Sequence, residues 1–193
     1  GVDTKRFSSN LLSRNFFRNE MTYDPNQIII GIVGRLHVDK NIDIFISAAE
    51  KLFQKYSKCR FLIVGDGDNN LKKKLNQKIS MLNLNAIVRI LPSSNEIVKV
   101  YNGIDIITSV SKTEGLQNSL LEALACNKYC VASHVGDSEF IVTEKSFLFA
   151  PYNDIDALIK SWLKVIKLID ENSEYKGRDL SLIHISEPTR QEA

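Results

Sequence analysis

The sequence has few cysteines, and they form no pattern that indicates a metal site or a disulfide framework. Only three of its 193 residues are cysteine, namely Cys59, Cys126 and Cys130. They make no CxxC pair and no Cys/His cluster, and an odd number leaves a framework of disulfides unclosed. Cys59 and Cys126 lie in apolar segments, where a thiol typically behaves as a small buried hydrophobe. We therefore expect no metal site, no thiol chemistry and a reducing, cytosolic setting.

Long hydrophobic runs and blocks of one charge are also missing. No run of ~18 apolar residues is present that could span a bilayer. The N-terminal GVDTKRF has neither the basic nor the apolar region of a signal peptide. The net charge is only +2, and the charged residues, 25% of the total, are interleaved along the chain. These absences argue against nucleic-acid binding, and the 44% hydrophobic content indicates a single soluble globular domain.

What the sequence does contain is an alternation of short apolar runs with longer segments of helical spacing. The short runs are continuously apolar, as in strands buried on both faces, and the longer ones carry apolar residues near i, i+3 and i+4. The predicted strands are 27–33, 61–65, 86–91, 104–110, 129–133 and 147–150, and the predicted helices are 42–56, 69–82, 95–102, 118–126 and 154–169. The alternation predicts an α/β fold, a Rossmann-like three-layer αβα arrangement with a parallel sheet of about six strands. Right-handed crossovers then bring the loops after the strands to one edge, where ligands bind.

The chain divides into three regions. Residues 1–26 form a polar run that leads into the first strand without a helix or strand of its own, so we expect the remnant of a linker from a longer protein. Residues 27–170 form the predicted domain, and residues 171–193 a tail outside its core. The last thirteen residues, SLIHISEPTRQEA, lack periodicity. They are either non-native, similar to translated sequencing-adapter read-through, or a frayed terminus.

The loop after the first predicted strand carries two cations beside a glycine. Gly34, Arg35 and Lys40 follow that strand, and a helix starts at Asn41. A glycine permits close backbone approach, an arginine can grip phosphate oxygens with two parallel hydrogen bonds, and a lysine adds a compact charge. The pattern predicts a diphosphate clamp. Taken alone it is more often a solvated basic turn, but its place after a strand favours the clamp.

A second segment places two glutamates around a predicted helix start. Glu114 and Glu122 are separated by seven residues, and a helix begins near Asn118, its predicted N-cap. That helix start offers free backbone N–H groups at Ser119 and Leu120, and a dipole of about half a positive charge, which suits a diphosphate. Glu114 can accept hydrogen bonds from sugar hydroxyls and Glu122 from ribose hydroxyls. Taken singly, each glutamate is more typical of an exposed loop or of a first helical turn.

Together these segments resemble the C-terminal, donor-binding domain of retaining glycosyltransferases with the GT-B fold, the large family 4. The resemblance covers roughly residues 1–169 and is carried by GVDTKRF (1–7), GRL and DK within 34–40, VGDG (64–67), TEGLQNSLLEALAC (113–126) and VASHVGDSEFI (131–141). It implies that Arg35 and Lys40 bind the donor diphosphate, that Glu114 contacts the transferred sugar and that Glu122 holds the ribose. The implied catalytic residues are Arg35, Lys40 and Glu114, and the implied donor-binding residues are Gly34, Gly115, Leu116, Gln117, Asn118, Ser119, Leu120 and Glu122.

The sequence departs from the family pattern at a few positions outside this charged set. Asn127 stands where the family usually has Gly, Tyr129 where it has Pro, and Asp137 where it has a second Gly. Asn is the next-best residue after Gly for a left-handed turn at the end of a helix, so we expect that turn to survive. Leu91-Pro92-Ser93 replaces the usual Leu-Gly near the nucleotide base, which leaves the identity of the base open.

The resemblance implies an enzyme that transfers a hexose-type sugar from a nucleoside diphosphate to an acceptor hydroxyl with retention of configuration, in polysaccharide or glycoconjugate biosynthesis. It implies no metal and no further cofactor. Its partners would be the nucleotide-sugar donor and an N-terminal acceptor domain that this sequence lacks, so the fragment would be inactive alone. We expect a cytoplasmic protein, with association at the inner face of the membrane left open. Two alternatives remain: a sugar-nucleotide epimerase of GT-B architecture, and a non-catalytic nucleotide-binding domain.

Overall fold

The centre of the molecule is a parallel sheet. We describe a computed structural model that defines residues 1–115, 117–136, 138, 147–149 and 151–171. Six strands pair in the order β3-β2-β1-β4-β5-β6, every pair being parallel. They are β1 (Ile28–Val33), β2 (Cys59–Val64), β3 (Val88–Leu91), β4 (Ile106–Ser109), β5 (Tyr129–Ser133) and β6 (Phe147–Phe149). The prediction of about six parallel strands is confirmed. The strand order reverses between β1 and β4, which is where open α/β sheets bind ligands.

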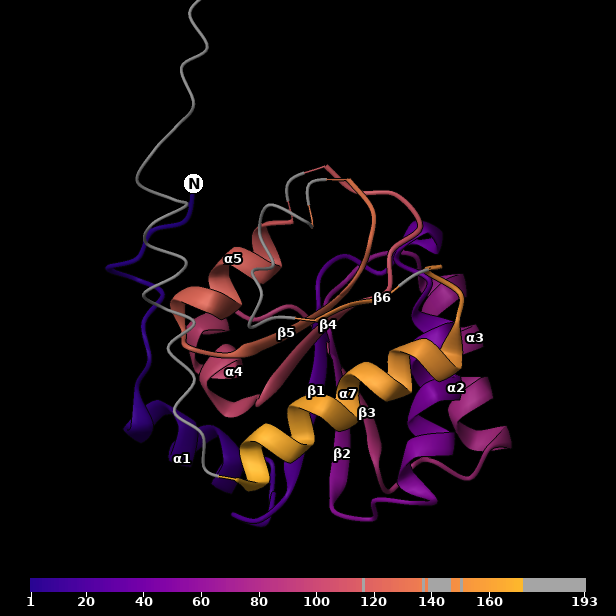
Figure 1. The fold of residues 1–193 in the computed structure, drawn as a ribbon, viewed down its shortest axis with the longest axis horizontal. Coiled ribbons are helices and arrows are strands. Elements are labelled where there is room, and N and C mark those ends of the chain that lie inside the picture. Colours follow the sequence, from indigo (N-terminus) through magenta and orange to yellow (C-terminus); the bar gives the residue numbers. More distant parts are fainter. Residues whose placement is uncertain (116, 137, 139–146, 150, 172–193) are drawn as a thin grey trace, which may run out of the picture.

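Helices cover both faces of this sheet and complete three layers (Figure 1). One face carries α2 (Ile42–Phe53), α3 (Asn69–Met81) and α7 (Ile155–Asp170), and the other carries α1 (Leu11–Glu20), α4 (Ile97–Gly103) and α5 (Asn118–Ala125). Between α2, α7 and the sheet, the rings of Phe45, Phe61 and Trp162 pack with centroids 5.4–5.9 Å apart. The indole N–H of Trp162 donates to the hydroxyl of Thr108 on β4 at 2.9 Å, which gives this buried ring its one polar partner.

Helix α1 corrects the expectation that no helix precedes the first strand. Three of its apolar residues, Leu11, Leu12 and Phe16, are 69%, 81% and 61% exposed, so apolar spacing alone does not mark the buried face. The buried residues are Phe17 and Arg18, and the Phe17 ring would lie 2.0 Å from a Cβ placed on Gly103 of α4. The helix packs on α4 because that position has no side chain. The assignment of residues 1–26 to an interdomain linker stays a prediction.

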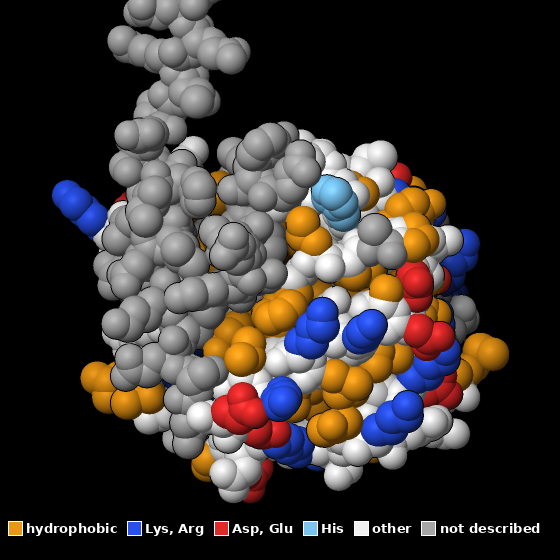
Figure 2. Space-filling view, viewed as in Figure 1, with side chains coloured by type: hydrophobic (Ala, Val, Ile, Leu, Met, Phe, Trp, Pro, Cys, Tyr) orange, Lys and Arg blue, Asp and Glu red, His pale blue; other side chains and the backbone are white. Residues whose placement is uncertain are grey.

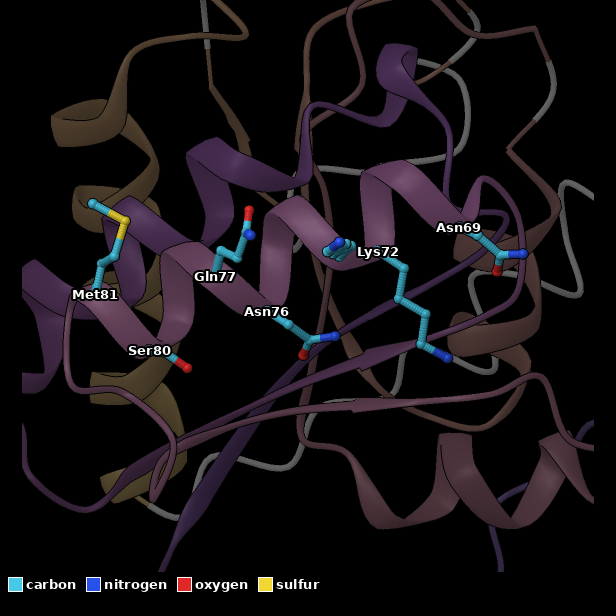
Figure 3. A pocket seen from close by; sticks show the side chains of 7 residues that line it. Asn69, Lys72, Asn76, Gln77, Ser80 and Met81 are labelled. Carbon is cyan, nitrogen blue, oxygen red and sulfur yellow. The ribbon is translucent and has the colours of Figure 1, made fainter.

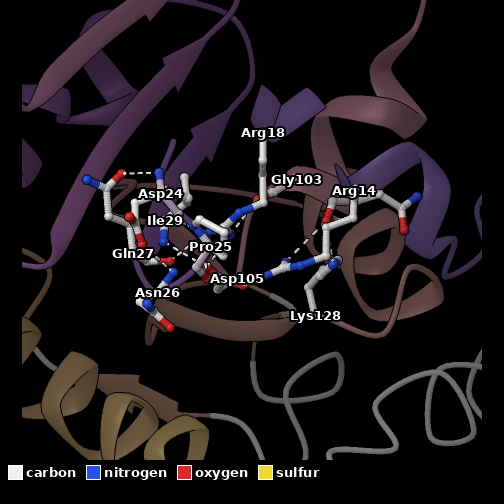
Figure 4. A network of polar contacts seen from close by, with 11 residues as sticks. Arg14, Arg18, Asp24, Pro25, Asn26, Gln27, Ile29, Gly103, Asp105 and Lys128 are labelled. Carbon is white, nitrogen blue, oxygen red and sulfur yellow. Dashed lines mark hydrogen bonds and ion pairs between the residues drawn. The ribbon is translucent and has the colours of Figure 1, made fainter. Parts of the chain in front are cut away.

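A network of charged groups fastens α1 to the sheet at the amino-terminal ends of β1 and β4 (Figure 4). Arg18 is buried and donates to Oδ2 of Asp105 at 3.1 Å and to the carbonyl oxygens of Gly103 and Asp24. Arg14 contacts Oδ1 of Asp105 at 2.6 Å, and Ile29 N–H donates to Oδ2 at 2.8 Å. A buried guanidinium is tolerated here because a carboxylate and several carbonyls satisfy it. This network occupies the edge opposite to the loops that carry the predicted site.

The turn after α5 forms as expected around Asn127, whose φ is 58°. Its N–H donates to the Leu124 carbonyl at 2.8 Å, and the N–H of Lys128 donates to the Ala123 carbonyl at 3.0 Å. These two bonds make a Schellman motif, in which asparagine takes the left-handed position usually held by glycine. The other predicted helices and strands are confirmed with ends displaced by a few residues: α2 stops at Phe53, and β2 starts at Cys59. Position 150, Asp137, the end of 131–141 and residues 172–193 lie outside the described residues.

Candidate functional site

Loops from adjacent strands meet at the carboxyl edge of the sheet. The loop after β1 contains a short 3-10 helix, Val38–Lys40, and the ammonium of Lys40 forms an ion pair and hydrogen bond with Oε1 of Glu114, in the loop after β4. The backbone joins the same two loops, since the Lys112 N–H donates to the Asp39 carbonyl at 2.8 Å. The sequence places these residues far apart, and the pairing of β1 with β4 brings them together.

The Glu114 carboxylate is held in place by serine hydroxyls at the ends of β4 and β5. The hydroxyl of Ser111 donates to Oε1 at 2.5 Å, and the Ser111 carbonyl accepts from the hydroxyl of Ser133 at the end of β5 at 2.8 Å. The Glu114 side chain is 15% exposed and that of Lys40 30% exposed, so a ligand can reach both while water reaches them only in part. A carboxylate fixed by two donors is preorganised for accepting hydrogen bonds from a sugar.

A third loop, after β5, closes over Glu114 through a glycine. Gly136 has a φ of 55°, and a Cβ there would lie 1.8 Å from the carbonyl oxygen of Glu114. The loop therefore requires both the left-handed backbone and the missing side chain of glycine at this position. Lys40, Glu114 and Gly136 thus belong to one cluster at the point where the strand order reverses.

Arg35, in contrast to Lys40, has no partner among the described residues. Its side chain is exposed and makes no hydrogen bond or ion pair with another residue of the described ranges. The backbone around it is tightly constrained, since Gly34 N–H donates to the Val64 carbonyl at 3.0 Å, and a Cβ on Gly65 would lie 1.9 Å from the Gly34 carbonyl oxygen. The close backbone approach predicted for Gly34 exists. Gly34 has a φ of 156°, which L side chains rarely adopt, and Gly65 in addition has no room for a Cβ. Arg35 thus lies on a constrained loop, without a partner in the described ranges.

The start of α5 corrects two predicted details. Gln117, not Asn118, takes the N-cap position, and its side chain makes no capping bond. The Leu120 N–H is not free, because it donates to the Gln117 carbonyl at 3.0 Å. Ser119 N–H, in contrast, has no acceptor within the part of the chain that the structure describes. A Cβ added to Gly115 would have no described atom within 4 Å, so there is open space beside this residue. Leu116 lies outside the described residues.

Gln117 itself is buried, and both polar atoms of its amide lack a hydrogen-bond partner. An unsatisfied buried amide is costly, so such groups are concentrated at functional sites. Among the described residues, the helix start therefore combines a backbone donor at Ser119 that has no acceptor with an unpartnered amide two residues earlier, at Gln117.

Glu122, one turn into α5, is half-buried and has a partner that sequence reasoning missed. The hydroxyl of Tyr101 on α4 donates to Oε2 of Glu122 at 2.7 Å. Burial raises the pKa of Tyr101, so its hydroxyl stays protonated and donates. The sequence carried no signal for this bond, because segment 95–102 also contains Asn95, Glu96, Lys99 and Asn102 and nothing singles out the Tyr101 hydroxyl. The structure gives no direct contact between Glu122, Ser119 or Arg35 and the Lys40–Glu114 pair.

A wide groove on the described surface lies elsewhere. It has a volume of about 880 Å³ and runs along the outer side of α3 (Figure 3), lined by Asn69, Lys72, Lys73, Asn76, Gln77, Ser80 and Met81. All of these side chains come from one helix, so no second element closes over a ligand there. On the face covered by α7, lysines such as Lys160 and Lys164 are scattered among hydrophobic side chains (Figure 2). Neither surface carries the convergent loops expected of a binding site.

A smaller pocket of about 260 Å³ opens beside the ends of β2 and β3. Val64, Leu91, Pro92 and Ser93 line it from the strand ends, and Val100 from α4, next to Tyr101. Asp66, in the adjoining loop, accepts from both the N–H and the hydroxyl of Ser93, and these bonds lower its pKa. Among the described residues, no three His, Cys, Asp or Glu side chains cluster as metal ligands, and no helix is long and apolar enough to cross a membrane.

Comparison with known proteins finds similarity to glycosyltransferases. The chain is 26% identical over 184 residues to the Escherichia coli UDP-Gal:alpha-D-GlcNAc-diphosphoundecaprenol alpha-1,3-galactosyltransferase, a match that covers 91% of this chain and 47% of that protein. The fold of this chain is similar to that of Anabaena HepE, whose crystal structure is a complex with UDP. The TM-score is 0.84 and the identity 20%, and the match covers 95% of this chain and 51% of HepE.

A third comparison matches the chain over its whole length. The C-terminal domain of the glycosyl transferase group 1 family protein LpcC from Francisella tularensis has a TM-score of 0.78 and 25% identity, with 100% of both chains covered. The chain thus spans about half the length of the E. coli relative and of HepE. The family model described as glycosyl transferases group 1 matches residues 27–168, which include every strand and all of the site loops. The chain belongs to the glycosyl transferases group 1 family.

Proposed function

We propose that this chain is the donor-binding, C-terminal half of a retaining GT-B glycosyltransferase. The observation that carries the proposal is the contact between Lys40 and Glu114 at the point where the strand order reverses. There a cation for phosphate and a carboxylate for sugar hydroxyls lie side by side, as a nucleoside-diphosphate sugar requires.

In this proposal Arg35 and Lys40 bind the diphosphate. Arg35 is exposed and has no partner in the described part of the chain, and so can turn to phosphate oxygens without breaking a described contact. The Lys40 ammonium pairs with the Glu114 carboxylate. When the donor binds, this ammonium lies between the Glu114 carboxylate and the phosphates. Both cations stabilise the negative charge that develops on the departing diphosphate as the bond to the anomeric carbon breaks, a large contribution in such reactions.

The start of α5 supplies the second half of the donor site. Ser119 N–H lies at a helix N-terminus, a position that favours anions, and has no acceptor among the residues that the structure describes. Glu122 would accept hydrogen bonds from the ribose, and Glu114, with the backbone of Gly115 to Gln117, would contact the transferred sugar. The pocket bounded by Leu91, Pro92 and Val100 is the proposed place of the nucleotide base.

The relatives support a uridine nucleotide as the first donor to test. The E. coli relative is named for UDP-galactose and a lipid diphosphate acceptor, and HepE was crystallised with UDP. We propose a glycoconjugate or polysaccharide hydroxyl as acceptor and a separate N-terminal domain as its binding site, so that this half alone would not transfer. The proposed chemistry needs no metal, since Arg35, Lys40 and the helix start carry the charge of the diphosphate.

Isothermal titration of the chain with UDP, GDP and ADP tests the proposal. One of them is expected to bind, and Arg35→Ala to weaken that binding about tenfold or more, as expected for a lost charge-assisted hydrogen bond. The matched control is Lys160→Ala, which removes one exposed positive charge from α7. Equal affinity in wild type and Arg35→Ala would contradict the proposal. Adding EDTA should leave the affinity unchanged.

Two further readouts separate the alternatives. An epimerase would convert a UDP-sugar to its epimer without any acceptor, which product analysis by NMR detects. A non-catalytic nucleotide-binding domain would bind UDP, but titration with a UDP-sugar would then show no dependence on Glu114.

A further inference from the structure

Tyr101 is a buried side chain that none of the family motifs contains, yet it contacts a predicted site residue. Its ring is fully buried on α4 and meets Phe7 edge to face, with centroids 5.9 Å apart and planes at 74°. Its hydroxyl donates to Oε2 of Glu122 at 2.7 Å, from one helix to the next. Within the described ranges this is the one hydrogen bond that the Glu122 carboxylate makes, and no described residue bonds to Oε1.

The helix that carries Tyr101 is itself held rigidly. Asn102, the next residue, accepts from the Asn10 N–H at 2.7 Å and donates to the carbonyls of Ser8 and Val98 at 3.1 and 2.9 Å. Its own backbone carbonyl accepts from the ammonium of Lys128 at 2.8 Å. The position of the tyrosine hydroxyl is therefore set by the fold, and does not depend on a ligand.

A carboxylate that recognises two vicinal hydroxyls has to present an oxygen in a fixed direction. A free glutamate samples several rotamers, and binding then costs the entropy of choosing one. The Tyr101 hydroxyl removes that freedom, because it engages one oxygen and leaves the other unoccupied. Since burial keeps the phenol protonated, it can only donate to the carboxylate over the ordinary pH range.

We propose that Tyr101 is a positioning residue for ribose recognition: its hydroxyl fixes Oε2 of Glu122 and so presents Oε1 to the 2′- and 3′-hydroxyls of the nucleotide. This inference rests on the proposed function, in which Glu122 contacts the ribose. Tyr101 touches no donor atom itself. The Tyr101 hydroxyl raises the affinity for a ribonucleotide. It leaves the affinity for a nucleotide without ribose hydroxyls unchanged.

The test is isothermal titration of wild type and Tyr101→Phe with two probes, UDP and 2′,3′-dideoxy-UDP. The phenylalanine keeps the ring and its contact with Phe7 and removes only the donor. We expect Tyr101→Phe to weaken UDP binding about 5- to 20-fold, less than the loss of a direct hydrogen bond to a charged group because Tyr101 acts through Glu122, and to change dideoxy-UDP binding less than about twofold. An equal loss for both probes, or no loss for either, overturns the inference.

The chain offers a matched control in Tyr23, a second buried tyrosine whose hydroxyl has no hydrogen-bond partner. Tyr23→Phe is expected to leave the affinity for both probes unchanged. Thermal unfolding shows whether Tyr101→Phe is folded. Should it not fold, Phe7→Leu replaces it, because this change loosens the Tyr101 ring and keeps the hydroxyl; a smaller loss confined to UDP then supports the inference, and a loss for both probes contradicts it.

Failure of this inference is distinguishable from failure of the proposed function. If Tyr101 is only structural, wild type still binds UDP and Arg35→Ala still weakens that binding. If the proposed function is wrong, wild type binds none of UDP, GDP or ADP, or binds them without dependence on Arg35, and both proposals fall together.

Discussion

Lys40 and Glu114 are 74 residues apart in the chain and form an ion pair at the carboxyl edge of the sheet. The phosphate-binding cation and the sugar-binding carboxylate that the sequence predicts are therefore partners of each other in the structure. Part of the positive charge available to a diphosphate is neutralised until the donor enters. The two residues should consequently respond in opposite directions to substitution.

Glu114→Gln is expected to bind UDP as tightly as wild type or up to about fivefold more tightly, because the charge of Lys40 is no longer shared with a carboxylate. Lys40→Ala should weaken UDP binding about tenfold. Titration calorimetry on the two single variants checks the pair. An equal loss of affinity in both would mean that Glu114 supports nucleotide binding through structure and not through charge.

Gly136→Ala is expected to destabilise the chain by about 1–3 kcal/mol, because it adds a Cβ in a left-handed conformation against the Glu114 carbonyl. Gly115→Ala is the matched control, since its Cβ would meet nothing within 4 Å. The midpoint of urea unfolding measures both changes. Similar stability for the two alanine variants would show that the loop after β5 relaxes easily and does not hold Glu114.

Asp105→Ala should cost about 3–5 kcal/mol of unfolding free energy, because it leaves the buried Arg18 guanidinium without its carboxylate. Asp156→Ala removes an exposed ion pair with Lys51, whose distance is 3.2 Å, and should cost less than about 1 kcal/mol. Chemical denaturation compares the two aspartates directly. A cost for Asp105→Ala no larger than that for Asp156→Ala would contradict the role given to the α1 network.

Stability should also depend on pH through Lys128, which is buried beneath α4. Burial, with repulsion from Arg14 as a second cause, lowers the pKa of Lys128 from 10.5 to about 8. Between these two pH values the unfolded chain holds a proton that the folded chain has released, so stability rises with pH. Relative to Lys128→Met, wild type should gain up to about 3 kcal/mol between pH 7 and pH 10. Urea unfolding of both proteins checks this, and parallel pH profiles would contradict it.

The sequence predicted the sheet well because its signal is local. Six continuously apolar runs each mark a strand that is covered on both faces, and the turn at Asn127 follows from the backbone preference of one residue. Helix α1 was missed for a physical reason. Leu11, Leu12 and Phe16 are exposed while Arg18 is buried beside Phe17, so the apolar residues form no continuous buried stripe along the helix.

The site was predicted as a set of residues but not as a set of contacts. Strand order places Lys40 beside Glu114, and no periodicity along the chain encodes the pairing of β1 with β4. The bond from Tyr101 to Glu122 is equally tertiary, since it crosses from one helix to its neighbour. At the start of α5, the bond from Leu120 N–H to the Gln117 carbonyl depends on backbone angles that residue types do not fix.

The central claim is that Arg35, Lys40 and the start of α5 face one diphosphate. A crystal structure of the chain with the nucleoside diphosphate that it binds measures this most directly. The account predicts phosphate oxygens at hydrogen-bond distance, about 3 Å, from the Arg35 guanidinium and the Ser119 N–H, with Lys40 drawn toward them. Phosphates bound in the groove along α3, or reached by only one of these two donors, would contradict it.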